Sequence, residues 1–184
     1  MFAYCLNNPV VFADTHGTDA CVVIDNDQAW GFGHICFFAQ DDEGTWWHFY
    51  WGPEDPYLPI IGINVEPVTW LKEYEGDISL EAINASGQYS RTYHRMIYLF
   101  GDFSDCIEQA TNLDSQYNLY FENCSQVSLS ILASANTPHK NRLESAAKKT
   151  IPKRAFKFIE ESCVSPAYNG STGVSGRNLF YTKY

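Results

Sequence analysis

The residue best placed to react is a cysteine at the start of a predicted helix. Cys124 follows Asn123 and opens the run Cys124–Leu132, whose apolar residues predict a helix. A cysteine at a helix N-terminus lies at the positive end of the helix dipole, which favours the thiolate over the thiol. Because a thiolate is a strong nucleophile, Cys124 is the candidate for attack on a carbonyl carbon.

The remaining cysteines occur in contexts that suit a structural role. Two lie in apolar strand-like runs, one in a predicted helix, one after a charged helix and one near the N-terminus: Cys21 and Cys36, Cys106, Cys163 and Cys5. A buried thiol in such a context packs as a small hydrophobic side chain. Cys124 could also be a buried structural residue, but it alone combines a helix start with polar neighbours on both sides.

A histidine in a strand-like run is the candidate base for this thiol. His34 follows Gly33 and begins an apolar run, and imidazole exchanges protons near neutral pH. Three other histidines are less suitable. His16 lies near the N-terminus, His94 can face solvent, and His139 lies in a basic stretch. We therefore assign His34 as the base.

His48 is the candidate third residue, because it shares a predicted β-hairpin with His34. Asp42-Glu43-Gly44 suits a three-residue loop with its glycine in the left-handed region, which pairs Phe38 with His48. His34, His48 and Tyr50 then share one face of the hairpin, whereas a two-residue loop would move His48 to the other face. His48 would orient the imidazole of His34, with Tyr50 as an alternative. His48 could instead be a structural histidine among tryptophans.

These residues predict chemistry through a thioester. The thiolate attacks a carbonyl, the backbone N–H of Cys124 and a second donor stabilise the oxyanion, and water or an amine releases the acyl group. Asn123 and Gln126, which flank Cys124 in the sequence, are predicted to orient the site or to contact substrate. Peptidase, amidase, deamidase and transglutaminase reactions share these steps, and the alternatives stay open here.

The order of predicted elements indicates an α+β fold, with strands in the first half and helices in the second. Apolar runs predict strands at 20–24, 34–39, 45–51, 78–83 and 91–100, with a proline-rich loop at 52–67. Helical patterns cover 102–112, 124–132, 143–149 and 154–161. A Gly/Ser-rich segment follows and predicts a flexible tail over 166–184.

Composition excludes several classes of partner. With 22 acidic and 12 basic residues among 184, the net charge is −10, which argues against a nucleic-acid partner. No apolar stretch approaches the ~20 residues of a transmembrane helix, and the first residues do not form a signal peptide. No CxxC pair is present, so we expect no zinc site, no other metal site and no cofactor.

The pattern Gly33-His34, His48 and Asn123-Cys124-Ser125-Gln126 resembles the circularly permuted papain-like superfamily, which includes NlpC-type cell-wall peptidases and the lecithin retinol acyltransferase group. The resemblance covers about 31–132. It implies an antiparallel sheet packed against the helix that carries the cysteine, in a catalytic domain over 18–165. It also implies a peptide or protein substrate. Lipid acyl transfer or phospholipase activity is the alternative, although Ser125-Gln126 stands where the acyltransferases usually have a glutamate-histidine pair.

Residues 1–17 resemble the end of the Rhs repeat-associated core. The resemblance rests on Tyr4, Asn7-Asn8-Pro9 and Asp14-Thr15-His16-Gly17, with threonine at 15 where the pattern has proline. In that family a variable C-terminal toxin follows the junction and is neutralised by a cognate immunity protein. The resemblance implies a bacterial toxin domain, exported as part of a larger protein and delivered into a target cell.

A protein of another class would carry the same residues without catalysis. In a non-enzymatic, Rhs-associated binding module, Cys124 would simply be part of the core. Selective, fast alkylation of one cysteine among the six would favour catalysis, whereas an unreactive Cys124 would favour the binding module.

Overall fold

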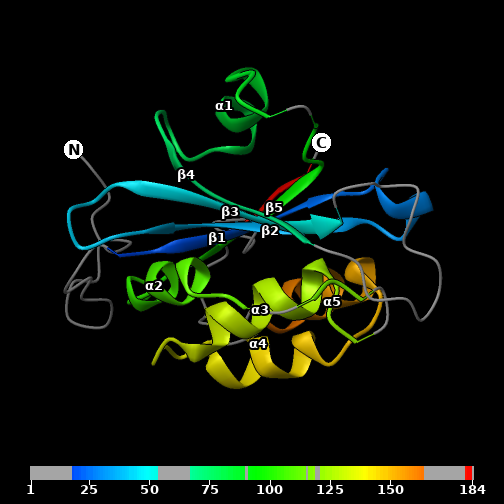
Figure 1. The fold of residues 1–184 in the computed structure, drawn as a ribbon. Coiled ribbons are helices and arrows are strands. Elements are labelled where there is room, and N and C mark those ends of the chain that lie inside the picture. Colours follow the sequence, from blue (N-terminus) through cyan, green and yellow to red (C-terminus); the bar gives the residue numbers. More distant parts are fainter. Residues whose placement is uncertain are drawn as a thin grey trace, which may run out of the picture.

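The computed structural model has an α+β architecture and describes residues 18–53, 67–89, 91–114, 116–118, 121–163 and 181–183. The predicted leader at 1–17 lies outside these ranges, as does most of the predicted tail at 166–184. An antiparallel sheet forms the centre, with the strand order β4-β3-β2-β1-β5-β6 (Figure 1). Its strands are β1 (Ala20–Asp25), β2 (His34–Gln40), β3 (Trp46–Pro53), β4 (Pro67–Tyr74), β5 (Arg95–Leu99) and β6 (Tyr181–Lys183).

The hairpin of β2 and β3 has the predicted register. The backbone N–H of Asp41 donates to the carbonyl of Thr45 over 2.9 Å, and Gly44 has φ of +86°. Phe38 is paired with His48, so the three-residue loop is confirmed. A short 3-10 helix, Ala29–Gly31, connects β1 to β2.

Two predictions for the middle of the chain are wrong. The segment 78–83, predicted as a strand, lies largely in helix α1 (Leu80–Ala85), because the hydroxyl oxygen of Ser79 caps the helix by accepting from the N–H of Ala82. β4 occupies a segment for which no strand was predicted. It is a half-exposed strand that carries Lys72 and Glu73, so its hydrophobic alternation is weak.

The helices of the second half occur where the sequence predicted them, with small shifts at their ends. They are α2 (Asp105–Thr111), α3 (Cys124–Ser134), α4 (Lys140–Ala147) and α5 (Pro152–Cys163). α2 to α5 cover one face of the sheet, and α1 lies on the other side (Figure 1). The helix that carries Cys124 therefore packs against the sheet, where α3 contacts β2 and β3.

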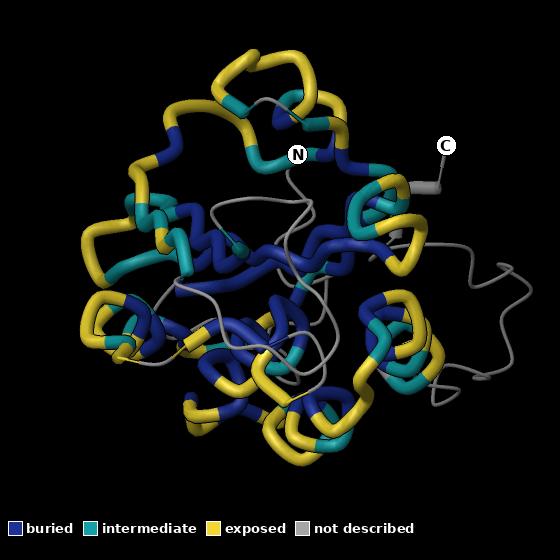
Figure 2. The backbone as a smooth tube through the Cα atoms, turned by 45° about the vertical axis from the view of Figure 1, so that its right-hand side comes forward, coloured by how far each residue is buried: buried dark blue, intermediate teal, exposed yellow. Residues whose placement is uncertain are grey.

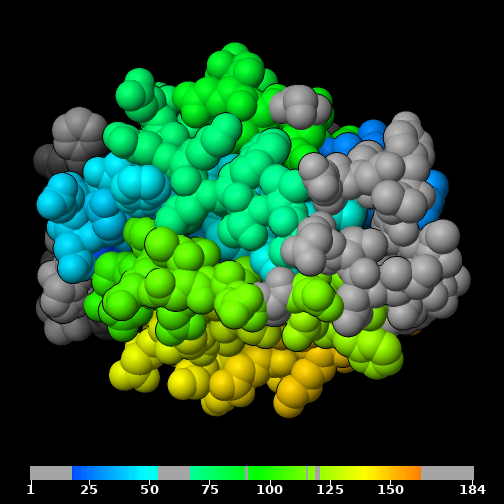
Figure 3. All heavy atoms as spheres, viewed as in Figure 1, coloured from blue at the N-terminus to red at the C-terminus, as the bar shows by residue number. Residues whose placement is uncertain are grey.

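The two faces of the sheet bury different side chains. Ile35 and Phe37 of β2 join the large core between the sheet and helices α2 to α5. Cys36 and Phe38 join a smaller, aromatic cluster on the α1 side. The central strands are buried on both faces, while the loops and outer helix surfaces are exposed (Figure 2). In the space-filling view, α1 lies above the edge strand β4, and α2 to α4 lie below it (Figure 3).

No helix within the described ranges combines the length and apolar character that crossing a membrane requires.

Candidate active site

Asn123 and Gln126 build the start of α3. The side-chain oxygen of Asn123 accepts from the N–H groups of Ser125 and Gln126 at 3.0 and 3.2 Å, while Gln126 Oε1 accepts from the N–H of Asn123 at 3.2 Å. This capping box satisfies backbone groups that a helix start leaves without partners. Asn123 Nδ2 also donates to the carbonyl of Thr150 over 2.8 Å. Both side chains therefore position Cys124 through the helix.

The thiol of Cys124 lies against the backbone of β2. Cys124 is 2% exposed, and its sulfur hydrogen-bonds with the backbone of Ile35. One helical turn later, the hydroxyl of Ser128 donates to the carbonyl of Ile35 over 3.5 Å. Two contacts to one strand residue fix the start of α3 along β2, next to His34 in the sequence.

The sulfur sits beyond the end of the ladder between β2 and β3. That ladder covers Phe37 to Gln40 and stops at the pair Phe37–Phe49, so the first residues of β2 lie outside it. Cys124 interacts electrostatically with Cys36 and Tyr50, which belong to the α1 side of the sheet. At this end of the strand, a thiol from the helix layer thus comes close to side chains of the opposite face.

His34 lies on the α1 side and is held by an aromatic ring. Its ring centroid is 4.8 Å from that of Tyr50, and the residue is 5% exposed. Burial, followed by the charges of Arg91 and His48, holds the pKa of His34 well below its usual range. Its Nε2 has no hydrogen-bond partner within the described part of the chain. His34 is thus a neutral imidazole, adjacent in sequence to the residue that contacts the thiol.

His48 is bonded to a tyrosine. Its Nε2 lies 2.9 Å from the hydroxyl of Tyr93, and its ring packs on Phe38 with centroids 4.5 Å apart. Burial, with smaller contributions from Arg91 and Lys72, lowers the pKa of His48 to about 3. In the structure, His48 shares the face of His34 but orients Tyr93, and the ring against His34 is that of Tyr50.

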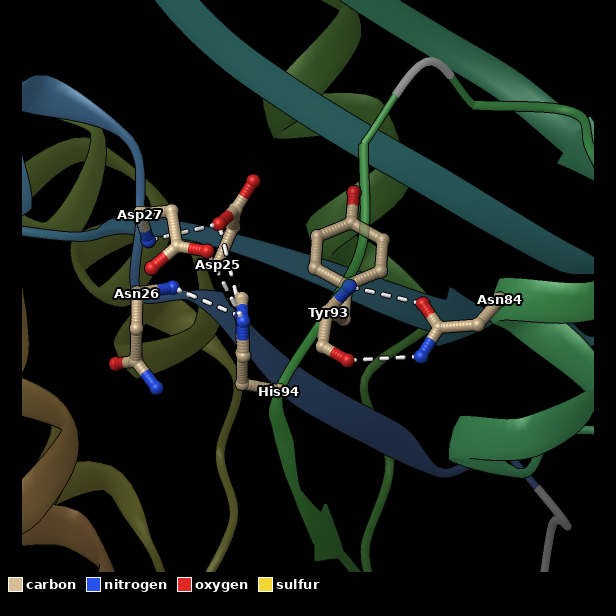
Figure 4. Close-up of polar contacts among 6 residues, drawn as sticks. All are labelled: Asp25, Asn26, Asp27, Asn84, Tyr93 and His94. Atoms are coloured by element: carbon tan, nitrogen blue, oxygen red, sulfur yellow. Dashed lines mark hydrogen bonds and ion pairs between the residues drawn. The ribbon is translucent and has the colours of Figure 1, made fainter. Parts of the chain in front are cut away.

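Helix α1 fixes the segment that contains Tyr93 (Figure 4). Asn84 Oδ1 accepts from the N–H of Tyr93, and Asn84 Nδ2 donates to its carbonyl, both over 2.8 Å. One amide side chain thus holds both backbone groups of this residue, as a neighbouring strand would. The clamp places the hydroxyl of Tyr93 against His48.

The thiol of Cys124 is protonated in this environment. Burial raises the pKa of Cys124 to about 12, although the backbone bond with Ile35 lowers it in part. The thiolate expected from the helix dipole is therefore not the resting form. Cys124 thus carries its proton and His34 is neutral; among the described residues, the thiol bonds with the backbone of Ile35 and Ser125, and the imidazole of His34 packs on Tyr50.

Arg91 and Asp25 are two residues of this region that sequence reasoning missed. Arg91 lies over the ring of Tyr50, with 4.3 Å between the guanidinium carbon and the ring centroid. The sequence feature that could have indicated Arg91 is the rarity of basic residues, since residues 1–136 contain only one lysine and two arginines. Asp25 is a buried carboxylate and the cross-strand partner of His34.

One group among the described residues has the spacing of metal ligands, namely Asp25, Asp27 and His94. The N–H of Asn26 donates to His94 Nδ1 over 3.2 Å, and His94 Nε2 lies 3.4 Å from Asp27 (Figure 4). Both ring nitrogens of His94 are thus engaged with the protein itself. The group links the end of β1 to the segment before β5.

No family model, no curated protein and no solved structure matches this chain.

Proposed function

We propose that the protein is a cysteine hydrolase or transferase of a circularly permuted papain-like type. Cys124 is the nucleophile and His34 is the base. The observation that carries the proposal is the contact between the thiol at the start of α3 and the backbone of Ile35, next to His34. Asp25 supports it as a buried carboxylate opposite His34 that can stabilise the imidazolium formed in the reaction.

The neutral resting pair determines the order of proton transfers. As the sulfur of Cys124 attacks a carbonyl carbon, His34 takes the thiol proton, and the N–H groups at the start of α3 donate to the oxyanion. His34 then gives that proton to the leaving amine, so the C–N bond breaks and a thioester forms. Water or a second amine attacks the thioester while His34 removes its proton, and the sulfur leaves with a proton from the imidazolium.

Burial of the thiol restricts which substrates react. Because Cys124 is 2% exposed, a substrate reaches the sulfur only when side chains around it shift. A narrow, extended acyl group requires smaller shifts of these side chains than a folded protein surface does. A peptide or isopeptide bond in an extended chain is accordingly the substrate class that we propose.

The biological setting that we propose is a toxin domain at the C-terminus of an Rhs-type protein, opposed by a cognate immunity protein. Its support is the resemblance of residues 1–17 to the end of the Rhs core. Cytoplasmic expression of the chain in bacteria, without an immunity protein, should inhibit growth. The variant C124A should abolish the inhibition, whereas C106A, which alters another buried thiol, should leave it intact. A C124A variant as inhibitory as the parent would contradict the enzymatic proposal.

A non-enzymatic binding module is the second candidate, because one observation favours it. A buried thiol whose pKa is raised to about 12 is what a cysteine used only for packing shows. In that case C124A would retain every function of the chain, and alkylation of Cys124 would require unfolding.

A further inference from the structure

Arg91 is a cation on the α1 side of the sheet that forms no ion pair within the described ranges. Its guanidinium lies over the ring of Tyr50 and hydrogen-bonds with the hydroxyl of that residue. The salt bridges within the described ranges belong to His94, Arg95 and Lys157, and none includes Arg91. Arg91 is half-buried, and a cation partly withdrawn from water gains from an anionic partner.

The thiols, hydroxyls and histidines around Arg91 carry no compensating charge near pH 7, and Asp25, a buried carboxylate that acts on the same Cys36 thiol, pairs with His94 instead. Burial raises the pKa of the thiols and hydroxyls among them and lowers the pKa of the two histidines. These neighbours are Cys36, Cys124, Tyr50, Tyr93, His34 and His48. In a chain with 22 acidic residues, the surroundings of this one cation contain none that forms an ion pair with it within the described ranges.

Two buried nitrogen atoms on the same face of the sheet also lack partners. His34 Nε2 and His48 Nδ1 form no hydrogen bond with any described residue. An unpaired buried polar atom costs roughly 1–3 kcal/mol, so two of them on the face that carries Arg91 are groups that a ligand can satisfy. The ligand must bring negative charge and hydrogen-bonding oxygen or nitrogen atoms.

We propose that Arg91 binds a carboxylate of the substrate that Cys124 attacks, an inference that rests on the proposed function. A guanidinium presents parallel N–H donors that match the two oxygens of a carboxylate. One positive charge balances one carboxylate, whereas a phosphate would bring up to about two negative charges to a single cation. The substrate class is therefore an acidic peptide or amide.

Thermal unfolding in matched salts tests the carboxylate site without requiring the substrate. Parent protein, R91Q, R91K and K157Q are heated in sodium acetate, sodium phosphate or sodium chloride at equal ionic strength. Lys157 lies exposed on α5, whereas Tyr50 belongs to the α1 side of the sheet, so K157Q makes the same charge change in the opposite layer (Figure 1). Acetate should raise the Tm of parent and K157Q by roughly 2–4 °C over chloride, because an anion that binds only the folded state stabilises it. R91K should show a smaller rise and R91Q none.

Several outcomes overturn the proposal. They are a parent protein without an acetate-specific rise, an equal rise in R91Q, or a rise with phosphate alone. If R91Q fails to fold, the parent protein still shows whether acetate binds. R91K then tests the role of the guanidinium, because it keeps the positive charge. If the acetate effect is absent but alkylation of Cys124 depends on His34, the carboxylate site falls and the proposed function stands. If the effect is present and alkylation is independent of His34, Arg91 binds a carboxylate but the proposed function falls, and with it the assignment of that carboxylate to a substrate of Cys124.

Discussion

The state of the Cys124 thiol is set by a competition between two effects. The dipole of a helix contributes about 0.3–1 kcal/mol to an ion at its N-terminus, and at most about 2 kcal/mol. A rise of the thiol pKa from 9.0 to about 12 corresponds to about 4 kcal/mol in the opposite direction. Burial therefore outweighs the dipole, and the helix start stabilises charge only once a substrate oxyanion forms.

The buried histidines should make the fold sensitive to acid. His48 has a pKa of about 3 in the folded protein, against 6.5 for an ordinary histidine, so the unfolded chain binds a proton that the folded chain does not. The contribution of His48 to the free energy of unfolding is therefore fully present above about pH 6.5. It falls by about 1.4 kcal/mol per pH unit as the pH decreases below that value. In H48Q, urea unfolding should show a pH dependence that is weaker by that amount between about pH 6 and pH 4. Equal pH dependence in parent and variant would contradict a neutral, buried His48.

At the scale of elements, the loop between β2 and β3 was the most predictable feature. Its sequence, Asp42-Glu43-Gly44, fixes the register locally, and the register determines which side chains share a face. The cap at Asn123 is equally local, which is why the start of α3 was predicted correctly. Residues 78–83 lie largely in a helix and not in the predicted strand, because the cap at Ser79 outweighs the alternation of apolar residues.

Gly52 is a second local requirement, because it makes room for the side chain of Tyr50. A Cβ atom at position 52 would lie 2.4 Å from the hydroxyl oxygen of Tyr50 and 2.8 Å from its Cζ. Tyr50 is packed between His34 and Trp70, with centroids 4.8 Å away in each case, so it cannot move freely. The glycine therefore fixes the ring that supports His34.

The variant G52A should lose roughly 1–3 kcal/mol of unfolding free energy, because the new methyl group overpacks the site. Y50F removes the hydroxyl oxygen, which is the atom nearest the new methyl group. The G52A change should therefore cost less unfolding free energy in the Y50F background than in the parent. Urea unfolding of the four proteins forms a double-mutant cycle. Additive losses, with no recovery in the double variant, would mean that Tyr50 does not lie over Gly52.

At the scale of the whole molecule, the candidate site depends on two layers meeting at one end of a strand. α3 packs against one face of the sheet, while His34 and Tyr50 lie on the α1 side, and the thiol bonds with the backbone of Ile35 where the ladder of β2 and β3 has ended. The sequence predicted the segments that carry Cys124 and His34. It could not predict Arg91 or Asp25, because their places depend on contacts between elements far apart in the chain.

The pH dependence of Cys124 alkylation by iodoacetamide tests the central claim, that His34 accepts the proton of this thiol. If His34 takes the thiol proton, the reactive thiolate–imidazolium form has the same number of protons as the resting thiol–imidazole form. The rate in the parent should therefore level off towards pH 7, above the rate of H34Q, while at higher pH the thiolate formed by loss of the proton to solvent adds a rising contribution. In H34Q the thiol must lose its proton to solvent, so the rate should be lower at pH 7 and should rise about tenfold per pH unit. Mass spectrometry of the Cys124 peptide gives both profiles, and a parent profile as steep as that of H34Q would contradict the account.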